Sequence, residues 1–187
     1  GIKSVEQLLQ KSSTSAQEID VIIVGTITPD MFFPSTAALV QDAIGATNAW
    51  AFDLNAACSG FIFSLGLGAS FIESGKHKKV LVIGGDPMTS VLDYEDRDTC
   101  VLFGDGAGAV LLEPTNDENG IVDSVMYTDG SGGNRLYMPA GGSRQPATLE
   151  TVEQRLHYLK QDGREVYKSA VRGMADATQA LLERNNF

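Results

Sequence analysis

The stretch Asp53–Ile72, DLNAACSGFIFSLGLGASFI, decides the fold, and it contains no charged residue between Asp53 and Glu73. The segment Trp50–Leu54 is short and apolar, as is typical of a strand, and the residues from Cys58 onward repeat apolar side chains at helical spacing. A helix whose other faces carry small residues in place of charges is expected to be buried. The stretch is too short, and too rich in Gly and Ser, to predict a membrane span.

Cys58 lies at the predicted start of this helix, between small neighbours that leave room around its sulfur. Unpaired backbone N–H groups and the positive end of the helix dipole favour the thiolate form of such a cysteine, which is the nucleophilic form. A strand-to-helix turn also lies at the carboxyl end of the sheet, where α/β proteins place their sites. Free cysteines are more often buried structural residues, but this position favours a nucleophile.

The composition is that of an ordinary globular protein, with 187 residues, 43% hydrophobic and 20% charged. A net charge of −10 argues against a surface that binds nucleic acid or an anionic membrane. Cys58 and Cys100 make no disulfide framework and suit a reducing cytoplasm. The chain opens without Met on a segment that is already helical in character, and it ends abruptly at Phe187, so we expect a piece of a longer protein.

Strands and helices alternate around the central stretch. Apolar runs rich in β-branched residues predict buried strands at Ile19–Thr26, Ala49–Leu54 and Val80–Gly84. A helix between the first two is expected to be capped by Ser35 and closed by Gly45. The short connections predict a β-α-β-α-β unit with a parallel sheet and right-handed crossovers.

The remaining elements follow weaker patterns. They are a helix at Val5–Gln10, strands at Ala109–Leu112 and Ile121–Tyr127, a turn at Pro114–Gly120, a long loop at Thr128–Thr148 and a helix at Arg164–Glu183. The strand at Ile121–Tyr127 is predicted from its alternating side chains, and the helix at Arg164–Glu183 from its one apolar face. A long ordered loop of this kind usually carries function.

Other candidate sites are weaker. The segment GDGAG, residues 104–108, lacks the third glycine of a dinucleotide loop and is followed by a strand, so we predict a tight turn with close backbone approach and with Asp105 as a turn residue. A zinc site would need clustered ligands, but Cys58, His77, Cys100 and His157 are scattered. His77 is expected to be solvated in the basic turn KHKK, and core packing suits Cys100. His157 could act as a base for Cys58, although nothing around it marks that role.

Four segments are distinctive together: DLNAACSGF at 53–61, VLVIGGD at 80–86, DRDTCVLFGDGAGAVLL at 96–112 and DGREVYKSAV at 162–171. They resemble the β-ketoacyl-acyl carrier protein synthase III family of condensing enzymes. The resemblance runs in order from about Ala16 to the C-terminus. It implies an α/β protein with the thiolase-like fold, which has two similar β-α-β-α-β halves. Residues 1–187 would be an incomplete N-terminal half with a mixed sheet and a buried central helix, and residues 149–187 would begin the connection to the missing C-terminal half.

The resemblance also implies a reaction. An acyl-CoA would acylate Cys58, and decarboxylative Claisen condensation with malonyl-acyl carrier protein would then initiate fatty acid synthesis. The backbone N–H of Cys58 would form part of the oxyanion hole. The family is a cytoplasmic homodimer that needs no cofactor besides its acyl-CoA substrate. Its catalytic His and Asn lie in the second half, beyond Phe187, so the chain alone is expected to be inactive.

The family's substrate-binding positions carry over to six residues. Phe33 would shape the acyl pocket of the partner subunit, Phe103 would lie near the nucleophile, Arg97 would pack on the CoA adenine, and Gly163, Arg164 and Tyr167 would line the CoA tunnel and acyl pocket. The acidic net charge departs from the basic rim that CoA and an acidic carrier protein require. Related possibilities are a hydroxymethylglutaryl-CoA synthase, a secondary-metabolite ketosynthase or a non-catalytic subunit of the same fold. The preferred acyl chain length is not fixed by the sequence.

Overall fold

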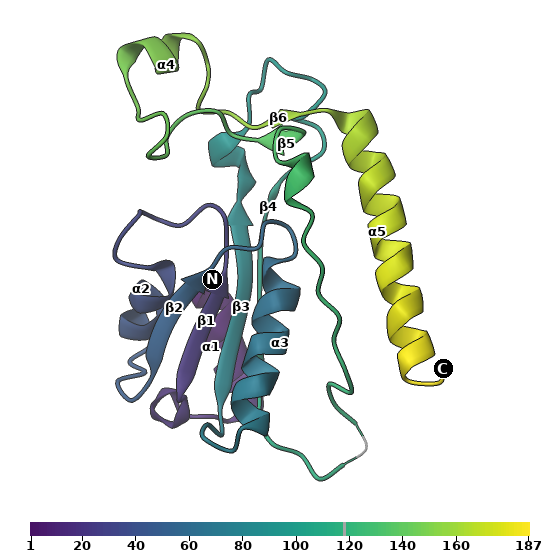
Figure 1. Cartoon of the computed structure of the whole chain (residues 1–187). Helices are drawn as coiled ribbons and strands as arrows, with labels where there is room; N and C mark the ends of the chain where they lie inside the picture. The colour runs from purple at the N-terminus through teal and green to yellow at the C-terminus, as the bar shows by residue number, and fades with distance from the viewer. Residues whose placement is uncertain (118) are drawn as a thin grey trace. The chain divides into compact units, whose positions relative to one another are not determined.

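A computed structural model describes residues 1–117 and 119–187. The chain divides into two compact units, one formed by residues 1–87 and 105–122 and the other by residues 88–104 and 123–187. The first unit holds the α/β core, and the second holds short elements and one long helix (Figure 1).

One mixed sheet forms the centre of the first unit. Its strands are β1 (Val21–Gly25), β2 (Trp50–Leu54), β3 (Val80–Pro87) and β4 (Asp105–Leu112), in the order β2-β1-β3-β4. β1 pairs in parallel with β2 and β3, whereas β4 runs antiparallel to β3. The strands predicted at Ile19–Thr26, Ala49–Leu54, Val80–Gly84 and Ala109–Leu112 and the mixed character of the sheet are therefore confirmed.

Helices cover both faces of this sheet, which gives three layers. α1 (Ile2–Ser12) and α2 (Thr36–Ala43) pack on one face, and α3 (Gly60–Glu73) packs on the other (Figure 1). A short 3₁₀ helix, η1 (Ala16–Glu18), precedes β1.

β1 and β3 form the centre of the core, as their continuous apolar runs predict. All five residues of β1 and the first four of β3 are buried. Because neighbouring residues of a strand point to opposite faces, each strand contributes to both packing layers. Ile22 and Leu81 lie in the cluster beside α1 and α2, while Ile23 and Val82 lie in the cluster beside α3.

α3 approaches the sheet through its small residues. Its buried residues are Gly60, Ser64 and Gly68. A methyl group added to Gly68 would come within 2.8 Å of Leu112 Cδ1, so the glycine allows the helix to pack closely without a shift of that side chain. The predicted burial of the helix is found on this sheet-facing side, whereas Ile62, on another face, is 53% exposed in the chain.

α2 begins and ends where its sequence predicts. Ser35 is the N-cap, and its hydroxyl oxygen accepts a hydrogen bond from Ala38 N at 3.2 Å. Gly45 follows the helix with a φ of 70°, a left-handed conformation that glycine adopts without strain.

The second unit contains less regular structure. Its elements are η2 (Met88–Val91), η3 (Gly130–Gly132), β5 (Leu136–Tyr137), α4 (Leu149–Glu153), β6 (Lys160–Gln161) and α5 (Gly163–Arg184). β5 and β6 pair antiparallel within the segment that includes the predicted loop. α5 confirms the predicted final helix almost residue for residue.

A buried carboxylate joins distant segments of the second unit. Asp93 is 5% exposed, and Arg155 binds it through both Nε, at 3.0 Å from Oδ2, and a second guanidinium nitrogen. Lys160 Nζ lies 3.9 Å from the same carboxylate. The hydrogen bonds from Arg155 lower the pKa of Asp93 to about 2 against the cost of burial.

Two predicted elements differ from the structure. GDGAG is not a tight turn, because β4 already begins at Asp105 and pairs with β3. Its small residues allow β4 to pack closely against β3, where Gly85 pairs with Ala107. A methyl group added to Gly85 would lie 2.9 Å from Ala107 Cβ. Ile121–Tyr127 forms no strand, since its alternating side chains have no neighbouring strand among the described residues. The predicted turn at Pro114–Gly120 includes residue 118, which lies outside the described residues.

Candidate active site

Cys58 lies in the turn between β2 and α3, and it is exposed. The helix begins at Gly60 with Ser59 as its N-cap, so Cys58 precedes the helix and does not lie in its first turn as predicted. Ala57, directly before Cys58, has a left-handed φ of 48°, so the chain enters this region through a turn.

Three hydrogen bonds hold this turn. Asn55 Oδ1 accepts from Ala57 N at 3.2 Å, Ala56 O accepts from Ser59 N at 3.1 Å, and Ala57 O accepts from Gly60 N at 2.9 Å. A left-handed alanine costs on the order of 1–3 kcal/mol and persists only where its surroundings enforce it. The turn is therefore built to place Cys58 at the carboxyl end of β2, outside the helix.

Asp53 lies on β2, the strand that leads to Cys58, and it connects this strand with the start of α2. Its Oδ2 accepts from Thr36 N and its Oδ1 accepts from Ala37 N, each at 2.8 Å. A carboxylate at a helix N-terminus meets unpaired N–H groups and the positive end of the dipole, and both interactions are favourable.

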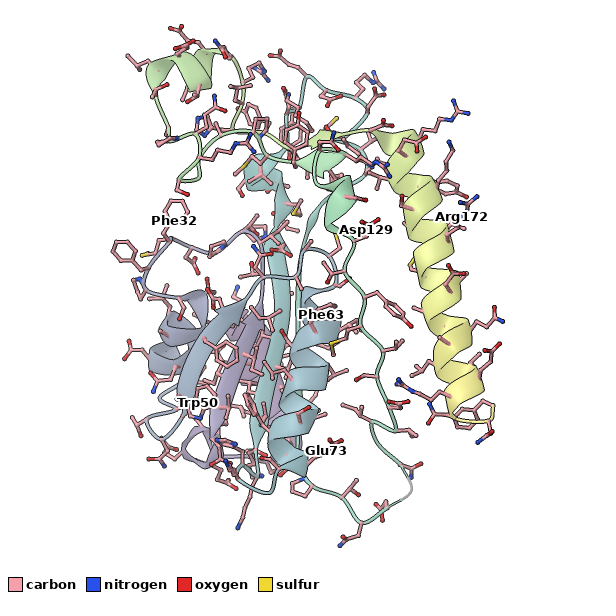
Figure 2. The ribbon with its side chains drawn as sticks, in the orientation of Figure 1. Phe32, Trp50, Phe63, Glu73, Asp129 and Arg172 are labelled. Atoms are coloured by element: carbon pink, nitrogen blue, oxygen red, sulfur yellow. The ribbon has the colours of Figure 1, made fainter. Side chains whose placement is uncertain are left out.

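Asp86, at the end of β3, holds the opposite end of the loop that precedes α2. Its Oδ1 accepts from Thr26 Oγ1, Ile27 N and Thr28 Oγ1 at 2.8 Å, and from Thr28 N at 3.1 Å. The tip of this loop, which carries Phe32 (Figure 2), is open to solvent.

The predicted site residues are divided between the two units. Cys58 and Phe33 belong to the first unit. The others belong to the second: Arg97, Phe103, Gly163, Arg164 and Tyr167. Phe33 is 84% exposed at the loop tip, and Tyr167 is 71% exposed on α5. Their predicted roles toward Cys58 remain predictions.

The lesser candidates have structural contacts of their own. His77 is not simply solvated, because its Nε2 lies 3.3 Å from the donor Trp50 Nε1 and its ring lies beside Phe71. Lys79, in the same basic turn, forms ion pairs with Glu18 and Glu113, so the turn is tied to its neighbours. The Trp50 side chain lies on β2, at the strand's first residue (Figure 2).

The second unit contains the other two candidates. His157 Nε2 lies 2.9 Å from Thr151 Oγ1, which supports a local structural role. Cys100 is half-buried, so it is packed less completely than predicted. Within residues 1–117 and 119–187, no cluster of three or more His, Cys, Asp or Glu side chains is arranged to bind a metal ion. None of the helices in this described part is long and apolar enough to span a membrane.

Comparison with known proteins shows what this chain is similar to. The family model described as 3-oxoacyl-[acyl-carrier-protein] synthase III matches residues 52–130, which include the Cys58 turn and β4. A β-ketoacyl-[acyl-carrier-protein] synthase III from Chlorobium phaeovibrioides is 61% identical over 181 residues, which cover 96% of this chain. Over the length that it spans, this chain is similar to the β-ketoacyl-[acyl-carrier-protein] synthase III proteins.

Solved structures agree with this similarity. The 3-oxoacyl-[acyl-carrier-protein] synthase III from Aquifex aeolicus superposes with a TM-score of 0.84 at 42% identity, covering 97% of this chain and 54% of that one. The priming β-ketosynthase of the R1128 polyketide pathway has a TM-score of 0.82 at 32% identity, with coverage of 98% and 54%. The predicted thiolase-like α/β fold is confirmed. The chain spans about half the length of the curated relatives it matches, 55% in the Chlorobium protein.

The groups that hold Cys58 and Phe33 in place were not singled out by any pattern in the sequence. Asp53 and Asp86 are each the last but one residue of a strand, a position that could have marked them, but their acceptor roles depend on segments far away in sequence. Asn55 directly follows β2 and could have been identified as a turn residue. Nothing in the sequence marks the left-handed Ala57, since alanine rarely adopts this conformation.

Proposed function

We propose that the full-length protein is a condensing enzyme that initiates fatty acid synthesis with Cys58 as its nucleophile. The observation that carries this proposal is the 61% identity to a β-ketoacyl-[acyl-carrier-protein] synthase III across 96% of the chain, including the turn that exposes Cys58. We further propose that residues 1–187 are mainly the N-terminal half of the enzyme and that residues 149–187 begin its connection to a second half.

The reaction has two stages. In the first, the Cys58 thiolate attacks the carbonyl carbon of an acyl-CoA, the C–S bond to CoA breaks, and the CoA thiolate leaves and takes up a proton. The Cys58 backbone N–H donates to the developing oxyanion. In the second, malonyl-acyl carrier protein loses CO₂, and the electron pair released forms a C–C bond to the thioester carbonyl. The Cys58 sulfur leaves as thiolate. The groups that stabilise the carbanion would lie in the part of the family that this chain does not span.

The other predicted residues would bind the substrates. Arg97 offers a planar guanidinium that can stack on the CoA adenine, and Phe103, Gly163, Arg164 and Tyr167 would line the tunnel and acyl pocket. The exposed Phe33 would enter the acyl pocket of a second subunit, which requires a homodimer. The enzyme would act in the cytoplasm and would need no cofactor besides acyl-CoA and malonyl-acyl carrier protein as substrates.

A second candidate is the priming of a polyketide pathway, which the R1128 ketosynthase performs by its name. It uses the same proposed nucleophile, so the two candidates differ in the acyl and carrier substrates. The lower identity of that neighbour, 32% against 61% for the Chlorobium protein, favours fatty acid initiation.

Reconstitution of the full-length protein tests the proposal. With acetyl-CoA and malonyl-acyl carrier protein, the enzyme should produce acetoacetyl-acyl carrier protein, and C58A should reduce the rate by at least about 10³-fold because covalent acyl transfer is lost. C100A is the matched control and should retain activity. Turnover that persists in C58A would overturn the nucleophile assignment, and activity only with a polyketide carrier protein would favour the second candidate.

A further inference from the structure

We infer that Asp53 and Asp86 are specificity-positioning residues, which clamp the loop bearing Phe33 and thereby set the acyl chain length that the enzyme accepts. The inference rests on the proposed function. It concerns residues that touch neither substrate nor nucleophile directly, and it derives from the hydrogen bonds at the two ends of one loop.

The first end of the loop is fixed at Asp86. One carboxylate oxygen receives four donors, two of them hydroxyls and two backbone amides, from residues 26–28. Thr26 is only 5% exposed, so this end lies against the sheet. Hydrogen bonds to an ionised acceptor are stronger than neutral ones, and four on one oxygen fix the direction in which the chain leaves β1.

The second end is fixed at Asp53. Its two oxygens accept separately from the successive amides of Thr36 and Ala37, at 2.8 Å each. This two-point contact determines both the position and the tilt of the first turn of α2. A further bond crosses the loop, from Asp30 N to Thr36 Oγ1 at 3.2 Å.

The loop between these clamps projects apolar side chains into solvent. Met31 is 47% exposed, and Phe32 and Phe33 are each 84% exposed. Exposed aromatic side chains on an unconstrained loop would sample many conformations, and their immobilisation on binding would cost conformational free energy. With both ends held by carboxylates on β2 and β3, the loop presents Phe33 in a preorganised position.

The consequence concerns the acyl pocket. If Phe33 closes the end of a pocket in the partner subunit, then the depth of that pocket depends on how firmly the loop is held. A loosened loop lets Phe33 retreat and admits longer chains. Asp53 stands on the strand that leads to Cys58, so it also ties the position of Phe33 to the framework that carries the nucleophile.

The test compares isosteric variants of the full-length enzyme. D53N and D86N each keep the side-chain shape but remove the charge. D53N also replaces one of two accepting oxygens with an NH₂ group, whereas D86N weakens four hydrogen bonds because the oxygen that accepts them is no longer ionised. D20N is the matched control, because Asp20 Oδ2 also accepts from two successive amides, Lys78 N and Lys79 N at 2.6 and 3.0 Å, at the opposite end of β1. The readout is the ratio of kcat/KM for hexanoyl-CoA to kcat/KM for acetyl-CoA, together with Tm.

We expect D53N and D86N to raise this ratio by about threefold or more, and F33A to raise it as well. D20N should lower Tm but leave the ratio unchanged. T28V, which removes only one hydroxyl donor to Asp86, should give a smaller rise and remains informative if D86N fails to fold. An unchanged ratio in D53N and T28V, with Tm reduced as in D20N, would show a purely structural role and overturn the inference. Failure of the wild-type enzyme to accept any acyl-CoA would instead overturn the proposed function itself.

Discussion

Gly25, the last residue of β1, lies directly against the backbone of Gly60, the first residue of α3. A methyl group added to Gly25 would come within 2.7 Å of the Gly60 carbonyl carbon. Added to Gly60, it would come no closer than 3.5 Å to Gly25. The contact is therefore asymmetric: it requires glycine in the strand, and it holds the start of the helix that follows Cys58.

The first prediction uses this asymmetry. G25A should force α3 away from β1, because the added methyl would clash with backbone atoms of Gly60, which no side-chain rotation can relieve. It should lower the free energy of unfolding by roughly 1–3 kcal/mol, as overpacking does. The displaced turn should also slow acylation of Cys58 in the full-length enzyme. G60A, whose added methyl makes an ordinary contact, should behave almost like wild type. Equal effects of the two substitutions on Tm and acylation rate would show that this packing does not position the turn.

The second prediction concerns the left-handed Ala57. N55A removes the side-chain acceptor of Ala57 N and should cost about 0.5–1.5 kcal/mol of stability, with a lower acylation rate at Cys58. Because glycine adopts a positive φ without strain, adding A57G to N55A should restore most of both losses. N48A removes an asparagine whose Nδ2 donates to Gln17 O away from the turn, and it should leave the acylation rate unchanged. If the double variant is no more stable than N55A and its Cys58 is acylated no faster, then Asn55 does not act through the conformation of Ala57.

The third prediction concerns acid stability. Arg155 hydrogen bonds lower the pKa of Asp93 from 3.8 to about 2. Because the folded-state pKa lies below the unfolded value, the stabilisation is present above about pH 4 and is lost as the pH falls through 2. D93N should lack this component, so its Tm should fall less steeply between pH 5 and pH 2 than that of wild type. D117N, which alters an exposed carboxylate, should follow the wild-type profile. If Tm falls with pH equally steeply in D93N and wild type, the ionised Asp93 paired with Arg155 is not the source of the acid-sensitive stability.

Much of the first unit follows from local pattern. The continuous apolar runs of β1 and β3 are buried on both faces, as such runs require, and Ser35 caps α2 as its residue type predicts. These features depend on residues near one another in sequence. The charge-free segment from Cys58 likewise predicted α3 and its packing against the sheet.

Features that depend on distant neighbours were not predictable. Glycine and alanine in GDGAG suggested a turn, but they allow close contact between β3 and β4, which only the pairing reveals. The alternation at Ile121–Tyr127 resembled a strand that would need a neighbouring strand to form. In the site, Cys58 was singled out as the candidate nucleophile from its position, whereas the Asp53 and Asp86 clamps join residues separated by 16 to 60 positions.

The most direct test of the central claim is the intact mass of the full-length protein before and after brief incubation with acetyl-CoA, followed by peptide mapping. The account predicts one acetyl increment that maps to the peptide containing Cys58, and its absence in C58A. The Cys100 peptide serves as an internal control and should remain unmodified. An acetyl group on another residue, or no adduct with any short acyl-CoA, would contradict the assignment of Cys58 as the acyl-accepting nucleophile.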